Sequence, residues 1–304
     1  MKTDYKEIFY NYEDYLLLEY SLSDNSIKAY ISDVNRFLNF LNDELSLDIT
    51  EITAENIRCY LEYIYEYKSS SVSRTLTSIK NFCRFLVKEK LLSFDPSCTI
   101  ESPKLTKLIP HVISESTVDL ILAAPDCSTF QGQRDKAMLE LVYATGMRVS
   151  ELVNIKFENV NFQDGFVKII GKGGKERLVP VCKRALEYLK QYVEGFRVQK
   201  DPKSALPYIF ISGKCNSNGK ICALTRIGFW QRIKKYCSDI GIDSSSVSPH
   251  AFRHAFATHL LNHDADLRSV QMMLGHSSLT TTQIYTYVAT YRMHQVFDRT
   301  HPRN

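Results

Sequence analysis

Apolar residues recur at helical spacing through the first hundred residues of this 304-residue chain. In four successive segments they fall at positions i, i+3, i+4 and i+7, which lie on one face of an α-helix. Residues able to cap a helix precede the segments, for example Ser23 and Thr53. The predicted helices cover roughly residues 5–19, 24–41, 54–64 and 71–90, and they are short enough to form a compact bundle.

The fourth predicted helix separates its apolar residues from its basic ones. Five residues point inward in this pattern: Leu76, Ile79, Phe82, Cys83 and Leu86. Four cations fall elsewhere on the helix surface: Arg74, Lys80, Arg84 and Lys88. These cations are candidates for contact with a DNA backbone, although lysine and arginine are also ordinary residues on solvated helices.

The helical spacing stops between Leu92 and Pro110, where Pro96, Pro103 and Pro110 occur among serine, threonine and lysine. This composition is typical of an extended linker. We therefore predict an N-terminal helical domain over residues 1–95, a linker over 96–110 and a second domain over 111–304.

The second domain is predicted to be mostly helical with a small antiparallel β-hairpin. Helices are expected at residues 115–124 and 133–145, and Gly146 is a typical residue to end the latter. Short apolar runs at 166–170 and 178–181 flank a glycine-rich stretch at 171–175, which indicates a hairpin. From Cys182 onward we expect helices again, apart from a polar break at about 212–220. The fold class is thus mainly α, with mixed α/β character in the second domain.

Charge is distributed unevenly along the chain. The formal net charge is only +4, and 44% hydrophobic with 24% charged residues is typical of a globular protein. Residues 1–66, however, contain 5 Lys and Arg against 14 Asp and Glu, whereas residues 67–304 contain 33 against 20. Such a division favours one surface that faces a polyanion and another that faces solvent or a partner. Because no run is long and apolar enough for a membrane span, a cytoplasmic location is expected.

The eight cysteines have irregular spacing and no Cys-x-x-Cys pair. We expect them to be reduced residues that pack in the interior. A zinc site that uses Cys215 and Cys222 is the alternative, but the interval between them matches no common ligand spacing.

A helix start near the C-terminus combines several features that favour phosphate. Ser248 is a typical cap and Pro249 suits the first helical position. His250 and Arg253 are three residues apart and therefore share a face of this helix. The free backbone N–H groups and the positive end of the helix dipole attract anions, and arginine can bind two phosphate oxygens at once.

Four other positions could complete a site for chemistry on phosphate. Arg148 follows Gly146 at another helix start, and Glu151 lies one turn later, where its carboxylate can hold the guanidinium. Lys172 is at the tip of the predicted hairpin, from which it can reach a leaving oxygen. Tyr285 is a potential nucleophile, with Tyr287 and Tyr291 as nearby competitors. Lys175 and Arg177, in and just after the same loop, are further candidates for DNA contact.

The chain resembles the tyrosine recombinases, the family that includes lambda-type integrases and the bacterial Xer proteins. The matching segments follow one another in order at residues 144–152, 171–173, 250–253, 274–276 and 283–285. Three further stretches, at 143–146, 262–268 and 287–290, resemble one of the two bacterial Xer recombinases more than its partner. Departures from the usual residues are small: Met147 stands in place of leucine, Asp264 in place of glycine and Tyr287 in place of histidine.

The resemblance implies a set of roles for these residues. Tyr285 is the nucleophile that attacks the scissile phosphate and forms a 3′-phosphotyrosyl bond. Arg148 and Arg253 stabilise the charge on the phosphate, while Lys172 protonates the leaving oxygen. His250 and His276 assist in proton transfer and hydrogen bonding, and Glu151 supports Arg148. Neither a metal nor a nucleotide is expected as a cofactor.

The resemblance also implies partners and an architecture. The expected partners are a double-stranded DNA recombination site and a second recombinase, or a further copy of this chain, in a tetramer clamped around DNA. A DNA translocase is a further candidate partner. The C-terminal segment 291–304 resembles a tail that such proteins pack onto a neighbouring protomer. Resolution of chromosome dimers is the expected role. An integrase of a mobile element, or a protein that bridges DNA without cutting it, remains an alternative.

Overall fold

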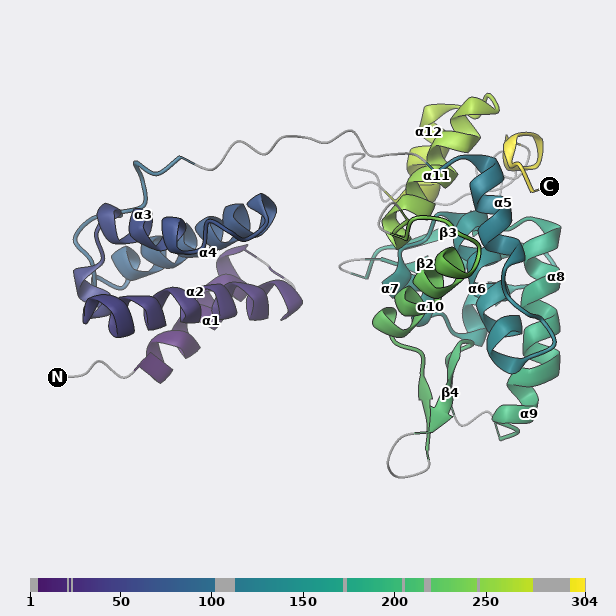
Figure 1. Cartoon of the computed structure of the whole chain (residues 1–304), viewed down its shortest axis with the longest axis horizontal. Helices are drawn as coiled ribbons and strands as arrows, with labels where there is room; N and C mark the ends of the chain where they lie inside the picture. Colours follow the sequence, from purple (N-terminus) through teal and green to yellow (C-terminus); the bar gives the residue numbers. More distant parts are fainter. Residues whose placement is uncertain are drawn as a thin grey trace. The chain divides into compact units, whose positions relative to one another are not determined.

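The chain forms two compact units in the computed structural model, Met1–Leu108 and Ile109–Asn304 (Figure 1). The structure describes residues 5–20, 22, 24–101, 113–171, 174–203, 206–215, 220–244, 247–275 and 296–303. Each unit has a hydrophobic core of its own, as separate domains do. Most of the predicted linker, residues 102–110, lies outside the described residues.

The four predicted N-terminal helices are confirmed. They are α1 (Tyr5–Tyr20), α2 (Asp24–Leu45), α3 (Ala54–Tyr63) and α4 (Ser69–Lys88), with a short 3₁₀ helix η1 (Ile49–Glu51) between α2 and α3. Thr53 caps α3 as expected and accepts a hydrogen bond from the backbone of Asn56. The five inward residues predicted for α4 are all buried, because a single apolar face of that helix lies against α2 and α1.

The C-terminal unit is built around α6 (Phe130–Thr145), which is buried on nearly every side. It packs against α5 (Glu115–Ala123), α8 (Lys183–Tyr192) and α11 (Pro249–Asn262) (Figure 1). Charged residues of α6 are buried with it and are paired; Asp135, for example, contacts Arg134, Arg232 and Tyr236. Because α6 is surrounded in this way, it fixes the positions of the helices that pack against it.

The remaining helices complete this unit. They are α7 (Val149–Val153), α9 (Val198–Lys200), α10 (Arg226–Asp239), α12 (Leu267–Leu274), the 3₁₀ helix η2 (Phe157–Asn159) and the π-helical turn η4 (Val193–Arg197). Residues 296–300 are also helical. Polar N-caps begin several of them: Thr225 caps α10, Ser248 caps α11 and Asp266 caps α12.

A three-stranded antiparallel sheet contains the predicted hairpin, which is confirmed. Its strands are β1 (Val160–Asn161), β2 (Phe166–Ile170) and β3 (Glu176–Pro180), in the order β1-β2-β3. Val167 pairs with Val179 and Ile169 pairs with Arg177, and all four residues are buried. The inward face of the hairpin therefore carries three apolar side chains and one arginine.

The predicted polar break near residues 212–220 is wrong in part, since strands flank it. Strands β4 (Ile211–Cys215) and β5 (Ile221–Ala223) form a second antiparallel hairpin. Figure 1 shows it extending from the body of the unit. Its outer residues are exposed or only partly buried, so the sequence lacks the apolar alternation by which strands are usually recognised.

Candidate functional site

Arg148 and Glu151 form a paired unit at the start of α7. Gly146 ends α6 in the left-handed conformation, with φ of +58°, and Arg148 is the residue that caps α7. One Glu151 oxygen accepts a hydrogen bond from the Arg148 backbone N–H at 2.7 Å, and the other accepts one from Nη1 at 3.0 Å. The Glu151 side chain is only 6% exposed, whereas that of Arg148 is 40% exposed. The pair is therefore an anchored arginine that faces solvent.

Arg177 is placed differently from the DNA contact that we expected. Its side chain is buried, and its guanidinium binds both Glu151 oxygens, at 3.0 Å and 2.7 Å. Its Nε donates to the carbonyl of Met273 at 2.8 Å. The expectation is corrected because these contacts leave the guanidinium facing its own protein and not the surface. Arg177 is two residues before the apolar Val179 and therefore lies on the same face of the strand, which was the signal in the sequence that could have indicated this burial.

Arg253 lies between the C-terminal ends of two helices. Its Nη1 donates to the carbonyl of Gly146 at 2.7 Å, and its Nη2 donates to the carbonyl of Leu274, the last residue of α12, at 2.5 Å. Carbonyls at a helix end lack partners within the helix and carry the negative end of its dipole, so they suit a cation. His250 lies in the first turn of α11, one turn before Arg253, and is exposed.

Three guanidinium groups thus lie close to a single carboxylate. Burial, together with the positive charges of Arg148 and Arg177, lowers the pKa of Arg253 to about 10, so Arg253 still carries its charge at neutral pH. Burial tends to raise the pKa of Glu151, but hydrogen bonds from Arg177 and Arg148 outweigh this effect and lower it. One negative charge cannot neutralise three positive charges. The chemistry of the cluster therefore suits an anion with several oxygens.

Three of the predicted catalytic residues, Lys172, His276 and Tyr285, lie outside the described residues. The residues that precede two of them in the sequence do lie at the cluster. A Cβ atom added to Gly171 would be 3.8 Å from Glu151 Oε1, and one added to Gly275 would be 3.0 Å from the Arg177 side chain. The segments that lead to Lys172 and to His276 therefore both reach the arginine cluster.

The four cations predicted on α4 are exposed or partly exposed, and each has a partner within its own unit. Arg74 binds the buried Asp33, Lys80 donates to the carbonyl of Ile100, Arg84 lies 3.9 Å from Asp95, and Lys88 binds Glu19. Lys175 is exposed in the hairpin loop. Contact of these five residues with DNA stays a prediction.

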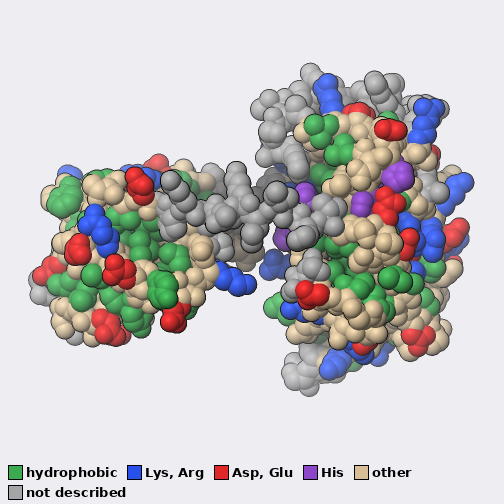
Figure 2. All heavy atoms as spheres, turned by 45° about the horizontal axis from the view of Figure 1, so that its top comes forward, with side chains coloured by type: hydrophobic (Ala, Val, Ile, Leu, Met, Phe, Trp, Pro, Cys, Tyr) green, Lys and Arg blue, Asp and Glu red, His purple; other side chains and the backbone are tan. Residues whose placement is uncertain are grey.

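Acidic side chains on the N-terminal unit do not form one continuous surface in the view of Figure 2. On the face shown they occur as separate groups among hydrophobic and uncharged residues. Several carboxylates of residues 1–66 are paired, such as Asp33 with Arg36 and Arg74. The predicted division into a polyanion-facing side and another side stays a hypothesis.

The cysteines pack in the interior less uniformly than expected. All eight are free; Cys83, Cys182 and Cys237 are buried, whereas Cys98, Cys127 and Cys215 are exposed.

Within the described ranges no group of three or more His, Cys, Asp or Glu residues could hold a metal ion. In the same ranges, no helix is both long and apolar enough to cross a membrane.

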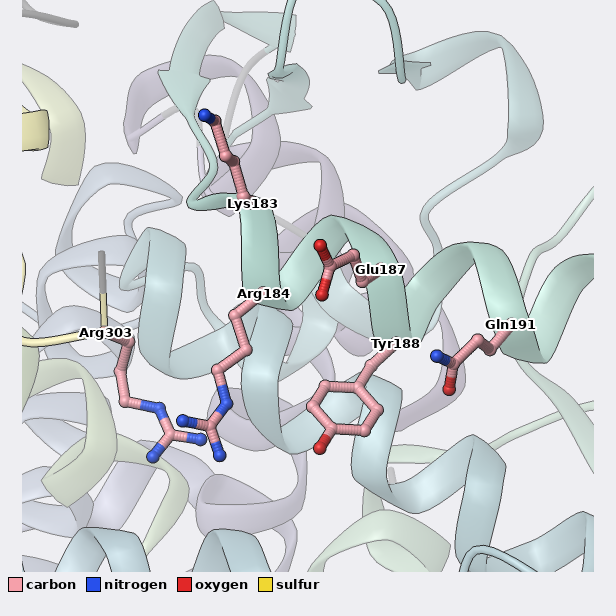
Figure 3. A pocket seen from close by; sticks show the side chains of 6 residues that line it. All are labelled: Lys183, Arg184, Glu187, Tyr188, Gln191 and Arg303. Atoms are coloured by element: carbon pink, nitrogen blue, oxygen red, sulfur yellow. The ribbon is translucent and has the colours of Figure 1, made fainter.

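A separate pocket of about 370 Å³ lies along α8 (Figure 3). It is lined by Lys183, Arg184, Glu187, Tyr188, Gln191 and Arg303. Arg303 comes from the C-terminal segment and is held there by Asp119 and Glu140, at 2.6 Å and 2.5 Å. The pocket shares no residue with the arginine cluster. The contacts of Arg303 show that the C-terminal segment packs on its own C-terminal unit.

Comparison with known proteins assigns both units. Residues 111–292 match the model of the phage integrase family, and residues 9–90 match that of the phage integrase N-terminal SAM-like domain. The chain belongs to the phage integrase family. This membership confirms the resemblance to tyrosine recombinases that the ordered motifs indicated.

Within this family the chain is similar to XerD recombinases over nearly its full length. It is 41% identical to tyrosine recombinase XerD of Yersinia pestis, with 100% of both chains covered. It is 44% identical to XerD of Shewanella oneidensis, with 93% of this chain and 92% of that protein covered. The three stretches at residues 143–146, 262–268 and 287–290 had predicted this XerD-type similarity, which is confirmed.

Solved structures of the family share this fold. XerH bound to its difH substrate in a pre-cleavage complex has a TM-score of 0.66 at 20% identity, covering 88% of this chain and 76% of that one. The Tn1549 transposon integrase in complex with circular intermediate DNA has a TM-score of 0.66 at 16% identity, covering 94% of this chain and 98% of that one. These likenesses confirm the predicted fold class, a helical N-terminal domain followed by a mostly α catalytic domain with small antiparallel sheets.

Proposed function

We propose that this phage integrase family member is a XerD-type site-specific recombinase that cuts and rejoins DNA to resolve chromosome dimers. The arginine cluster carries this proposal: Arg148, Arg177 and Arg253 surround one carboxylate and retain net positive charge. A phosphodiester in its cleavage transition state is an anion with several oxygens, and preorganised charge at such a site is usually the largest contribution to catalysis.

In the proposed reaction Tyr285 attacks the scissile phosphorus and displaces the 5′-oxygen of the next nucleotide. The tyrosine loses its proton as the new bond forms, and Lys172 gives a proton to the departing 5′-oxygen. The products are a 3′-phosphotyrosyl bond and a free 5′-hydroxyl. One phosphodiester replaces another, so the bond energy is kept for religation when a 5′-hydroxyl of another strand attacks.

The arginines and histidines support both directions of this exchange. Arg148 and Arg253 bind the non-bridging oxygens, and the carbonyls of Gly146 and Leu274 hold Arg253 in place. His250 is exposed in the first turn of the same helix, where it can reach a bound phosphate and assist proton transfer together with His276. Glu151 fixes the orientation of Arg148.

The proposed partners follow from strand exchange between two DNA sites. The substrate is a double-stranded recombination site, and four recombinases act together, two of this chain with two of a XerC-like partner, or four copies of this chain. An FtsK-like translocase is a candidate activator. Since the proposed substrate is chromosomal DNA, the protein would work in the cytoplasm. The similarity to XerD proteins favours this role over an integrase of a mobile element.

A covalent trap tests the proposal. The protein is incubated with a panel of suicide recombination sites nicked near the point of cleavage, so that the released fragment diffuses away and the adduct accumulates. We expect a protein–DNA adduct from the wild type and from Tyr287→Phe, and none from Tyr285→Phe. An adduct that persists in Tyr285→Phe but is lost in Tyr287→Phe would overturn the nucleophile, and no wild-type adduct on any site, with or without a partner recombinase, would overturn the function.

A further inference from the structure

Arg177 contacts two helices of the arginine cluster, α7 and α12, and the glycine that follows α12. It belongs to β3, binds both oxygens of Glu151 on α7, and donates to the carbonyl of Met273 near the end of α12. Its side chain also lies against Gly275, where an added Cβ atom would be 3.0 Å from its Cδ. A hydrogen bond from the N–H of Gly171 to the carbonyl of Lys175, at 2.7 Å, closes the hairpin loop beside it.

These contacts give Arg177 a role that differs from that of the other two arginines. Its side chain is only 5% exposed, whereas that of Arg148 is 40% exposed. The guanidinium of Arg177 thus faces the protein and uses its donors on Glu151 and Met273, while Arg148 faces the solvent from which DNA approaches. Arg177 is therefore placed to act on the site through Glu151 and not by touching the substrate.

The negative charge of Glu151 acts on both Arg148 and Arg177. Glu151 accepts hydrogen bonds from both arginines, so its single negative charge is shared between them. Without Arg177, the whole charge of a buried carboxylate would act on Arg148, and the attraction of Arg148 for a phosphate oxygen would weaken. Glu151 would also lose the bidentate contact that fixes its orientation.

We infer that Arg177 is a positioning residue for recombination, which holds Glu151 in place and offsets its charge so that Arg148 remains available to the scissile phosphate. The inference rests on the proposed function and deepens it, because it adds a residue that acts through another on the same reaction. It also connects the hairpin that leads to Lys172 with the helix end that leads to His276.

The test uses the full-length protein and single-turnover cleavage at saturating DNA. Arg177→Met removes the charge and keeps much of the side-chain length. Arg197→Met is the matched control, because Arg197 is just as buried, pairs with Asp201 and donates to the carbonyls of Leu206, Tyr208 and Ile209, yet shares no residue with the cluster. We expect Arg177→Met to slow cleavage about 10²-fold, and Arg197→Met to cleave at nearly the wild-type rate even if both melt at lower temperature.

A double variant separates positioning from a general loss of structure. In Arg177→Met with Glu151→Gln, the uncompensated carboxylate is gone, so cleavage should be faster than in Arg177→Met alone; a purely structural role predicts that the second change slows it further. Arg177→Lys should fall between wild type and Arg177→Met. Equal cleavage rates for Arg177→Met and Arg197→Met would overturn the inference, as would a double variant no faster than Arg177→Met. In either case a covalent adduct formed by the wild type would still support the proposed function.

Discussion

The guanidinium of Arg253 donates a 2.7 Å hydrogen bond to the carbonyl oxygen of Gly146, two residues before Arg148. Gly146 thus positions both arginines that are proposed to hold the phosphate. Its carbonyl binds Arg253, and the chain that follows it leads to Arg148. Its left-handed conformation, with φ of +58°, turns the chain from α6 towards α7.

Gly146→Ala should therefore damage the site and the fold together. A Cβ atom at this position would be 2.3 Å from Cδ1 of the buried Phe256, and the left-handed backbone adds strain. We expect a loss of about 2–5 kcal/mol in the free energy of unfolding, the sum of the backbone term and overpacking. Chemical denaturation measures it.

Gly241→Ala is the matched control for this substitution. Gly241 has a similar φ of +72°, but nothing lies within 4 Å of an added Cβ atom. Only the backbone term remains, about 1–2 kcal/mol. Equal losses in the two variants would contradict the importance of the contact with Phe256.

Lys172→Ala should show an effect that depends on the leaving group. If Lys172 protonates the departing oxygen, its removal should slow cleavage about 10²–10⁴-fold on an ordinary site. On a site with sulfur in place of the 5′-bridging oxygen, the rate should return close to that of the wild type, because a thiolate leaves without a proton. Lys175→Ala, in the same loop, is the control: if Lys175 contacts DNA and does not protonate the leaving oxygen, its removal should affect both sites equally, with no rescue by sulfur. Equal slowing of Lys172→Ala on both sites would assign Lys172 another role.

The C-terminal segment should lose stability in acid because of His301. Burial lowers the pKa of this histidine to about 4, below its ordinary value of 6.5, so His301 is neutral when the segment is packed. The packed state binds fewer protons than the unfolded state between these values. Its stability is therefore complete above about pH 6.5 and falls towards pH 4, by about 3 kcal/mol in total.

Thermal denaturation of the wild type and His301→Gln across this pH range measures that contribution. The variant should unfold with a weaker dependence on pH than the wild type. Identical pH profiles for the wild type and His301→Gln would exclude His301 as the cause.

Phe297→Ala should destabilise the catalytic unit of a single chain. Phe297 is fully buried in its core and stacks on His301, with ring centroids 4.6 Å apart. Loss of a buried phenylalanine costs about 3–5 kcal/mol, which a melting curve can detect. Arg299→Ala changes an exposed position of the same helical turn and should melt like the wild type. If the C-terminal segment did not stabilise the single chain, Phe297→Ala and Arg299→Ala would give the same melting curve.

Deletion of residues 292–304 tests whether the tail also serves a neighbouring protomer, as we predict. The deletion should weaken synapsis of two DNA sites more than binding of one protomer to one site, when both are measured at a temperature where the shortened chain remains folded. Equal losses in the two assays would count against exchange of the tail between protomers.

Local signals explain which elements could be predicted. The N-caps at Thr53 and Ser248 and the helix end at Gly146 each depend on residues only a few positions apart, and all three are confirmed. The hairpin of β2 and β3 was predictable because apolar runs flank its glycines. The hairpin of β4 and β5 was missed, since its strands are short and mostly exposed, so that burial left no pattern in the sequence.

The sequence by itself determined the helices, the first hairpin, the family and the residue types suited to chemistry on phosphate. Only the tertiary structure decided that Arg148, Arg177 and Arg253 share the surroundings of one carboxylate, and that Arg177 is buried. The contacts responsible join residues 26, 96 and 107 positions apart. A pattern along the chain reports which face of an element is buried, but which charged group meets which depends on how the elements pack around α6.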